Sequence, residues 1–380
     1  MDHNNCDVLI IGGGPAGLAA AIALRMRGAD VIVADALKPP IDKACGEGLM
    51  PDSVRDLAAF GIPLTRRDGA PFFGVRFVNW KEAGTADVAS EFAIGHGFGV
   101  RRTTLHMRLM QRAVELGVRL RWNTRVTLQK QVILNGEGCS YRYLIGTDGQ
   151  SSRVRSWAHL DKGVVVSRRF GFRRHFRIAS RSSFKPLVEV YWGDLGQAYV
   201  TPVSEDQICV ATISSHSGVR MRQIIDAMPS LREQLKEAEP LNRERGAITT
   251  TCRLKKVVRG NVALLGDASG SVDAVTGEGL AISFRQAALL GQSIENGDLM
   301  EYATKHQSTL QLPQQMSRLM LWMGKHPLLR NRIMRMFAAS PESFHQMLQV
   351  HLGKMTVPHF LLHHGAEIGW RLAYPLPKCI

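Results

Sequence analysis

The chain has 380 residues, of which 45% are hydrophobic and 21% charged, so it can bury a sizeable core and is not expected to be disordered. Its formal net charge of +15 would suit nucleic acid, an anionic membrane surface or an anionic substrate. The cations are scattered along the chain without a nucleic-acid-binding motif, so we expect no nucleic-acid partner.

The six cysteines have neither CxxC nor metal-ligand spacing, which is typical of reduced thiols and predicts no metal site. No segment reaches the ~18 uncharged apolar residues that a transmembrane helix needs. The apolar run at the N-terminus is too short for a signal peptide. The sequence therefore predicts a cytoplasmic protein.

A β-α-β unit is expected at the N-terminus. Residues 7–11 are an apolar run of strand length, and residues 18–27 are an alanine- and leucine-rich helical segment. A second apolar run, 31–34, ends at Asp35. This order predicts two parallel strands joined by a helix.

The turn between the first strand and the helix has the pattern Gly12-x-Gly14-x-x-Gly17. Gly12 permits the tight turn, Gly14 lets the backbone approach a pyrophosphate, and Gly17 lets helix and strand pack closely. The helix N-terminus offers unpaired N–H groups to the phosphates. Asp35 is expected to accept hydrogen bonds from the adenosine ribose, with a turn residue as the alternative. The unit therefore predicts a dinucleotide site.

Later segments return to the same sheet. A helix is expected at 103–116, and apolar strands are expected at 118–122, 143–146 and 262–265. A glycine-containing loop and a helix at 279–296 follow the last of these strands. The dinucleotide-binding domain is therefore expected to be discontinuous in sequence.

Two blocks of short alternating apolar segments, 70–95 and 164–213, predict antiparallel strands of one substrate domain. Beyond residue 300 the pattern is helical. We expect an α/β fold, with a Rossmann-like binding domain, an inserted antiparallel-sheet substrate domain and a C-terminal helical segment. The expected boundaries are 1–70 plus 100–160 plus 255–312 for the dinucleotide-binding domain, 71–99 plus 161–254 for the substrate domain, and 313–380 for the helical segment.

Two further motifs identify the dinucleotide. Residues 144–155, LIGTDGQSSRVR, resemble the GADGxxSxVR motif of the flavoprotein hydroxylase superfamily, with Thr147 in place of its usual alanine. Residues 264–270, LLGDASG, and 273–280, DAVTGEGL, resemble the GDAAH and DPxxGxG region of that superfamily. This resemblance to the aromatic monooxygenase-like flavoproteins implies that the cofactor is FAD.

In that family the aspartate that matches Asp267 binds the flavin ribityl chain, and the loop that matches 277–280 presents a helix N-terminus to the pyrimidine edge of the ring. Because a reduced flavin is anionic there, backbone N–H groups and the helix dipole stabilise it. The resemblance implies that FAD is contacted by Gly12, Gly14, Pro15, Ala16, Gly17, Asp35, Arg102, Asp148, Gly149, Gly266, Asp267, Gly277, Gly279 and Leu280.

Arg102 matches the family arginine that approaches the cofactor at the start of a helix. Four residues later the family usually has Asp, whereas this chain has His106. We expect His106 to be a polar residue on the helix surface.

Residues 45–49, CGEGL, are similar to the C-G-E/G-G-L element of the geranylgeranyl reductase-like branch, which lies near the flavin ring. Cys45 is the candidate catalytic residue, as a proton source beside the ring; a soft packing group and a structural thiol are its alternatives. Glu47 is expected to cap the following helix or to face the substrate, and capping is favoured.

The substrate cavity is expected between the flavin and the antiparallel sheet, where aromatic residues favour a small apolar or aromatic substrate. No general base stands out, and His175 and His216 are the candidates. Core packing is the alternative for each of the residues expected to face the ring, namely Tyr191, Trp192, Tyr199, Thr201 and Pro202.

The resemblance leaves three functions open. The first is an NAD(P)H-dependent monooxygenase that hydroxylates an apolar or aromatic metabolite, with NAD(P)H bound transiently because no second GxGxxG pattern is present. The second is a geranylgeranyl reductase-like enzyme that saturates a double bond of a lipid or isoprenoid. The third is a non-catalytic flavin-binding protein associated with a membrane.

The helical segment 313–380 is rich in basic residues and methionine. These helices would suit peripheral contact with an anionic membrane or an entry for a lipid-like substrate. A helical lid that packs on the sheet is the alternative, and it is favoured because most amphipathic helices bury their apolar face in the core.

Overall fold

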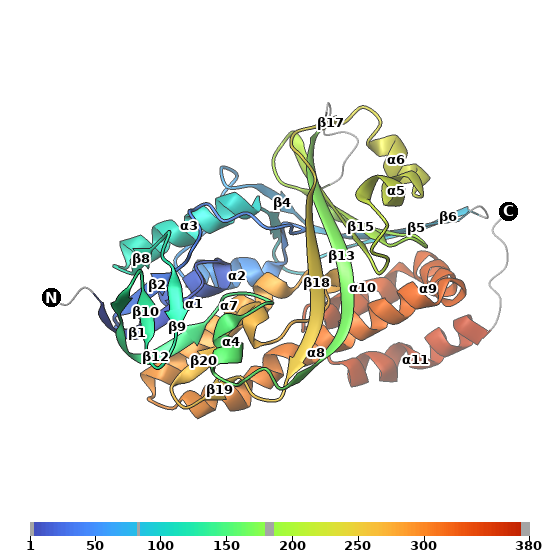
Figure 1. Cartoon of the computed structure of the whole chain (residues 1–380). Helices are drawn as coiled ribbons and strands as arrows, with labels where there is room; N and C mark the ends of the chain where they lie inside the picture. The colour runs from blue at the N-terminus through green and yellow to red at the C-terminus, as the bar shows by residue number, and fades with distance from the viewer. Residues whose placement is uncertain (1–3, 82–83, 179–185, 374–380) are drawn as a thin grey trace.

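The computed structural model describes residues 4–81, 84–178 and 186–373. It has an α/β half and a half built on an antiparallel sheet, with the C-terminal helices packed against the second half (Figure 1). In this part of the chain the two largest sheets have six and eight strands.

The six-stranded sheet is parallel except at one edge. Its central strands are continuous apolar runs because helices cover both faces, so every side chain of residues 31–34 is buried. Its strands, in order across the sheet, are β19 (Val258–Arg259), β20 (Val262–Leu264), β12 (Ser140–Gly146), β1 (Asn5–Ile11), β2 (Val31–Ala34) and β8 (Arg119–Arg121).

The first helix begins directly after the glycine-rich turn, with Pro15 at its first position, where a proline costs no helical hydrogen bond. This helix packs against the helix that follows the last parallel strand, because both present small side chains. The helices of this half are α1 (Pro15–Arg25), α2 (Pro51–Ala59), α3 (Arg102–Glu115), α4 (Arg153–Trp157) and α7 (Gly279–Glu295).

The eight-stranded sheet is antiparallel except for the pairing of β14 with β5. The strands β13 and β18 form a long ribbon in the middle of the molecule (Figure 1). The strands are β17 (Glu239–Pro240), β13 (Gly163–Arg177), β16 (Gln207–Ser214), β15 (Gln197–Pro202), β14 (Val188–Trp192), β5 (Gly74–Lys81), β6 (Gly84–Glu91) and β18 (Arg245–Leu254), the last of which pairs with β13.

Helices cover both faces of this sheet. On one face lie α5 (Met221–Asp226) and α6 (Pro229–Gln234), and their apolar side chains share a core with the sheet. The other face is covered by α8 (Leu299–Lys325), α9 (Pro327–Ala339) and α10 (Pro341–His351). The last helix, α11 (Val357–Ala373), contacts α9 and α10.

Within the described ranges, no helix is both long enough and apolar enough to pass through a bilayer. The last residues of the predicted helical segment, 374–380, lie outside the described part of the chain. Helices α8 to α10 bury an apolar face on the sheet, which is the packing that the sequence analysis favoured for the C-terminal segment.

Two small three-stranded sheets complete the fold. One contains β3 (Gly48–Leu49), β7 (Gly97–Gly99) and β4 (Ala70–Phe72), and so places the loop before β3 beside the start of α3. The other contains β9 (Val126–Leu128), β10 (Val132–Leu134) and β11 (Glu137–Gly138). Short 3₁₀ turns, η2 (Gly266–Ser269) and η3 (Ala274–Thr276), lie between β20 and α7.

The expected α/β class is confirmed, with a parallel core sheet and a second, antiparallel sheet. Every strand of the eight-stranded sheet falls within the segments 71–99 and 161–254, which were expected to form the substrate domain. Elements from three separate segments of the chain build the parallel half, because the antiparallel strands are inserted between β2 and α3 and between β12 and β20.

Candidate active site

One cavity of about 850 Å³ runs between the two halves of the molecule. The glycine-rich turn and the loops after β2 and β12 line one end, and η3 with the start of α7 lines the middle. Side chains of the antiparallel sheet, α8 and α10 line the other end. A ligand in this cavity would therefore contact both halves of the fold.

The glycines of the turn have different roles. A Cβ atom on Gly12, whose φ is +113°, would lie 2.5 Å from the Thr147 carbonyl oxygen, and one on Gly17 would lie 1.9 Å from the Gly12 oxygen. Gly14 faces open space in the cavity. Since no side chain caps α1, its free N–H groups and dipole suit the phosphates of a dinucleotide.

Asp35 holds the turn together. Its carboxylate accepts hydrogen bonds of 2.7 Å from the backbone N–H groups of Gly13 and Leu37. Asp35 also lines the cavity, where remaining lone pairs face the ligand space. The contact with the adenosine ribose stays a prediction. The carboxylate of Asp35 also stabilises the turn through these two hydrogen bonds.

Asp148 and Asp267 both line the cavity. Asp148 accepts hydrogen bonds from the Arg153 and Val154 N–H groups and from the Ser152 hydroxyl, so it caps α4. Asp267 binds the Lys43 ammonium at 3.0 Å, and both side chains line the cavity.

Not every predicted FAD contact reaches this space. Pro15, Ala16, Gly149 and Leu280 line the cavity, whereas Gly17 and Gly266 are buried behind its wall, where a Cβ on Gly266 would lie 2.8 Å from Ala16 Cβ. These two glycines permit close packing.

The start of α7 is the second helix N-terminus in the cavity. Gly277, with φ +70°, and Gly279 both face open space, and no side chain caps this helix. Asp273 fixes the preceding turn by accepting a hydrogen bond from the Val275 N–H at 3.0 Å. The free N–H groups of this terminus would stabilise an anionic ring edge.

Arg102, the first residue of α3, lines the cavity, and its buried Nε has no hydrogen-bond partner in the part of the chain that the structure describes. Such a group is satisfied by an anionic or carbonyl-bearing ligand. With two uncapped helix termini, an open glycine turn and this cation, the residues present fit FAD.

The expectation for His106 is wrong. Its side chain is fully buried, and its Nε2–H donates to the Gly13 carbonyl oxygen at 2.8 Å. The ring also lies against Trp122, with the ring centroids 5.8 Å apart. Burial lowers the pKa of His106, so the neutral ring supports the glycine turn from behind.

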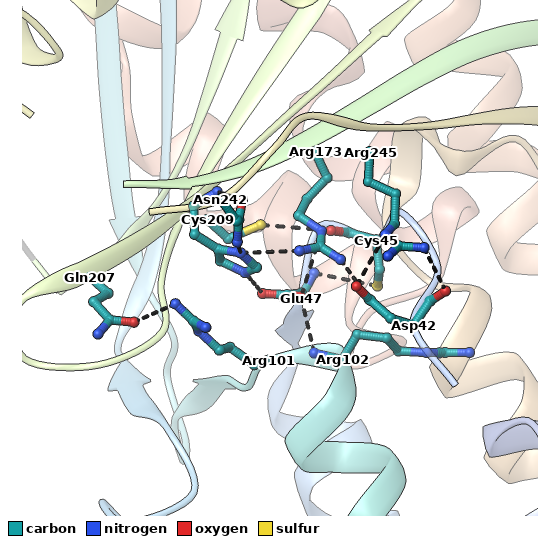
Figure 2. A network of polar contacts seen from close by, with 11 residues as sticks. Asp42, Cys45, Glu47, Arg101, Arg102, Arg173, Gln207, Cys209, Asn242 and Arg245 are labelled. Carbon is teal, nitrogen blue, oxygen red and sulfur yellow. Dashed lines mark hydrogen bonds and ion pairs between the residues drawn. The ribbon is translucent and has the colours of Figure 1, made fainter. Parts of the chain in front are cut away.

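The loop 42–48 lies beside the start of α3, and Figure 2 shows its polar contacts. Glu47 caps a helix as expected, but the helix is α3 rather than the following α2, because Glu47 Oε1 accepts from the Arg102 N–H at 2.9 Å. Cys45 lines the cavity, and burial raises the pKa of its thiol. Its Sγ accepts from the Glu47 N–H at 3.4 Å.

The two candidate histidine bases are in different places. His216 is exposed in the loop after β16. His175 is buried and binds Glu47 at 2.6 Å, so it is not a cavity-lining base. The potential ligand atoms of Glu47, His175 and Cys209 all lie within 4.8 Å of one another. Since both ring nitrogens of His175 have hydrogen-bond partners, a metal ion would have to break this network.

Only some of the residues predicted to face the flavin ring line the cavity, because side chains alternate between the two faces of a strand. Tyr199 and Thr201 line the cavity. Tyr191 points to the opposite face, where its hydroxyl donates to Glu189 at 2.7 Å. Trp192 is buried against Phe77 and, like Pro202, is outside the cavity lining.

The far end of the cavity is apolar and has no counterpart among the residues predicted from the sequence. Apolar side chains from β5, β14, α8 and α10 form it, and their methionines were recognised only as a feature of the C-terminal segment. The far end is lined by Val75, Phe77, Val188, Val190, Met316, Leu319, Met320, Met323, Phe344, Met347 and Leu348, with His351 beside them.

Comparison with known proteins agrees with this geometry. A family model described as an FAD binding domain matches residues 5–296. The chain belongs to this FAD-binding family. Its relatives include flavin-dependent reductases and hydroxylases, and the protein is an FAD-dependent oxidoreductase.

Menaquinone reductase of Mycolicibacterium smegmatis is 25% identical to this FAD-binding protein, over 81% of each chain. Digeranylgeranylglycerophospholipid reductase 2 of Methanosphaera stadtmanae is 24% identical, over 77% of this chain and 79% of the relative. The solved structure of a flavoprotein/dehydrogenase from Cytophaga hutchinsonii has the same fold, with a TM-score of 0.80 and 20% identity over 97% of this chain and 99% of that chain.

Proposed function

We propose that this flavoprotein is a reductase that adds two hydrogens across a carbon–carbon double bond of a long, apolar, isoprenoid-like substrate. Bound FAD, once reduced, supplies the hydride for this reaction. The protein binds the isoprenoid substrate, keeps water away from the reacting double bond and brings a proton to its second carbon.

The apolar far end of the cavity carries this proposal. Unbranched methionine side chains adapt to a flexible hydrocarbon, and burial of each methylene group contributes ~0.8 kcal/mol. The cavity continues from the two glycines at the start of α7 to Leu319 and Met323 on α8, so one chain could lie along it with a double bond near the ring. The names of the two reductase relatives support the same substrate class.

A proton source has to stand near the reacting bond. Cys45 lines the cavity on the side of the loop 42–48, and His351 lines it on the side of α10. His351 also borders a second, small cavity of about 10 Å³, together with Glu278. Glu278 is buried, its Oε2 has no hydrogen-bond partner among the described residues, and burial raises the pKa of its carboxyl group. We propose that Glu278 and His351 deliver the proton.

NAD(P)H is the electron donor that we propose. Lys43 and Arg153 are exposed cations that line the cavity, and they would attract an anionic dinucleotide for a brief encounter. Anaerobic mixing with NADH, NADPH or dithionite, followed by flavin absorbance, would identify the donor. Reduction by dithionite alone would contradict this part of the proposal.

Peripheral contact with an anionic membrane is proposed for the outer side of α8 and the start of α9. Leu319 is a wall residue of the cavity that is also exposed, and Trp322 and Leu328 are exposed beyond it. Arg318 and Lys325 flank these apolar side chains and are exposed. Basic and apolar side chains together favour an anionic lipid surface.

Arg330 cannot contribute to that contact. It is buried and binds Asp194 at 2.6 Å and Asn79 at 3.0 Å, so it attaches α9 to the sheet. Flotation with vesicles that contain anionic lipid would test the membrane contact. Replacement of Trp322 and Leu328 by serine should abolish flotation, and unchanged flotation would contradict the proposal.

The deciding experiment compares two reactions of the FAD-loaded protein. Under anaerobic conditions, with reduced flavin and menaquinone or a geranylgeranyl lipid, mass spectrometry should detect a gain of two hydrogens per reaction. Substrate-stimulated consumption of NAD(P)H and O₂, with oxygen in the product, would instead identify a monooxygenase. Gly17→Ala is the control, because its Cβ would collide with the Gly12 oxygen and so abolish FAD binding.

A further inference from the structure

Glu47 and His175 form a buried hydrogen-bonded pair beside the cavity. Glu47 belongs to the loop 42–48 and His175 to β13, and Glu47 Oε2 lies 2.6 Å from His175 Nε2. Both side chains are about 2% exposed. The pair therefore joins a loop of the FAD-binding half to the antiparallel sheet.

The neighbours of His175 fix the position of its proton. Asn242 Oδ1 accepts from the His175 backbone N–H at 3.2 Å, which turns the Asn242 amide N–H₂ group toward His175 Nδ1 at 2.6 Å. The Arg173 guanidinium also donates to Nδ1, at 3.0 Å. Since Nδ1 faces two donors, it is an acceptor, and the ring is neutral with its proton on Nε2.

The same reasoning fixes the charge of Glu47. Its Oε2 accepts from His175 Nε2–H, and its Oε1 accepts from the Arg102 N–H at 2.9 Å. Because a donor faces each oxygen, both hydrogen bonds are strongest when the group is a carboxylate, and no acceptor for a carboxyl proton is needed. Glu47 is therefore an ionised carboxylate, and Arg173 Nε, at 3.9 Å, is the nearest cation.

That cation is shared. Arg173 Nη2 also binds Asp42 at 2.6 Å, and Asp42 binds Arg245 at 3.1 Å (Figure 2). These two carboxylates and two guanidinium groups together have no net charge, so loss of the Glu47 charge would leave a net positive charge beside the cavity. Burial limits screening of that charge by water and salt. Its loop lines the cavity together with Gly277 and Gly279, where the family resemblance implies the edge of the flavin ring.

We propose that the fixed negative charge of Glu47 lowers the reduction potential of the bound flavin. A reduced flavin is anionic, so a carboxylate that stays ionised beside it opposes reduction, while Arg102 and the α7 dipole favour it. The reduced cofactor is then a stronger hydride donor. This inference rests on FAD binding and does not depend on the proposed substrate.

The test is a redox titration of the FAD-loaded protein with dithionite and indicator dyes. Glu47→Gln removes the charge at nearly constant shape. Glu47→Gly also removes it, and glycine suits the left-handed φ of +61° at this position. Both variants should favour reduced flavin by about tenfold, which is about 30 mV for a two-electron couple.

Glu189→Gln is the matched control. Glu189 is an equally buried carboxylate, but it lies on the opposite face of the sheet and binds Tyr191 and Arg76. Its variant should keep the potential of the parent protein. An unchanged or lowered potential in both Glu47 variants, loss of FAD from both, or an equal shift in the control would overturn the proposal. Since the titration needs no substrate, its failure is distinct from failure of the alkene assay.

Discussion

Asp273 Oδ1 accepts a hydrogen bond of 3.1 Å from Arg169 Nη1, and both side chains are almost completely buried. Arg169 belongs to β13, whereas Asp273 begins the turn before α7. Removal of one partner leaves an uncompensated buried charge, at a cost of about 3–5 kcal/mol. We expect Arg169→Met to lower the free energy of unfolding by about that amount and to weaken FAD binding, as measured by urea denaturation and flavin titration.

A double-mutant cycle separates pairing from packing. Arg169→Met with Asp273→Leu removes both charges, so the double variant should be more stable than the sum of the two single variants predicts. Simple additivity would show that the two side chains do not act as a pair. FAD affinity should remain low in the double variant, because Asp273 also accepts the Val275 N–H that shapes the turn.

His306 predicts an acid limit to stability. It is buried between Gln286 and Ser269, behind the η2 turn, and burial lowers its pKa from 6.5 to about 4. The folded state therefore binds this proton less readily than the unfolded state. The contribution of the neutral His306 to the free energy of unfolding is fully present above pH 6.5. It is lost as the pH falls from 6.5 to 4, and the loss is about 3 kcal/mol in total.

Urea denaturation at several pH values would measure this loss. His306→Gln should be less stable than the parent at pH 7 and should lose less stability between pH 6.5 and 4. A variant with the slope of the parent would show that other groups cause the acid limit. A His→Gln substitution at the exposed His216 is the matched control.

The FAD-binding half could be predicted from the sequence because its signals are local. A strand, the glycine turn and a helix follow one another within residues 5–25, and a Cβ atom on Gly12 or Gly17 would collide with backbone atoms, whereas Gly14 leaves the cavity open. The later motifs extended the prediction to Asp267 and to the start of α7. These positions depend on backbone geometry, which short segments encode directly.

The substrate half could be predicted only in outline. Alternation predicts strands, but not which face of β14 is turned to the cavity, so Tyr191 was expected on the wrong side. The burial of His106 depends on Trp122 and Gly13, which are remote in sequence, so no local pattern predicts it. The partnership of Glu47 with His175 spans 128 residues and has no local signal.

The proposed substrate path predicts that bulk at its far end lowers activity without loss of FAD. Leu319 and Met347 line that end from α8 and α10 and are not fully buried, so each can accept a tryptophan without severe overpacking. Leu319→Trp and Met347→Trp should lower kcat/KM for a long isoprenoid at least tenfold. This corresponds to a loss of about 1.4 kcal/mol of transition-state stabilisation. Flavin content should stay unchanged.

Met300→Trp is the control, since Met300 is an exposed residue of the same helix, away from the cavity. It should keep the activity of the parent. Shorter isoprenoids should be affected less than long ones by the two cavity variants. Equal losses for all chain lengths would contradict an extended path along α8.

The proposed proton route predicts a pH dependence. Because burial raises the pKa of Glu278, its carboxyl group stays protonated to higher pH than an exposed glutamic acid, and activity should fall as the pH rises through that pKa. Glu278→Gln should lower kcat for alkene saturation by about 100-fold and remove this limb of the profile. His351→Phe should have a similar effect on kcat.

The rate of flavin reduction by the donor separates this role from damage to the cofactor site. Both variants should reduce their flavin at the rate of the parent, because the proton is needed only when the hydride leaves for the substrate. Asp52→Asn is the control, since Asp52 borders the same small cavity and is paired with Arg285; it should keep the kcat of the parent and only move the pH limb to lower pH, because the Asp52 charge helps to raise the pKa of Glu278. A pH limb that persists in Glu278→Gln would contradict the role of Glu278. Loss of activity in Cys45→Ser, with activity kept in His351→Phe, would then assign the proton to Cys45.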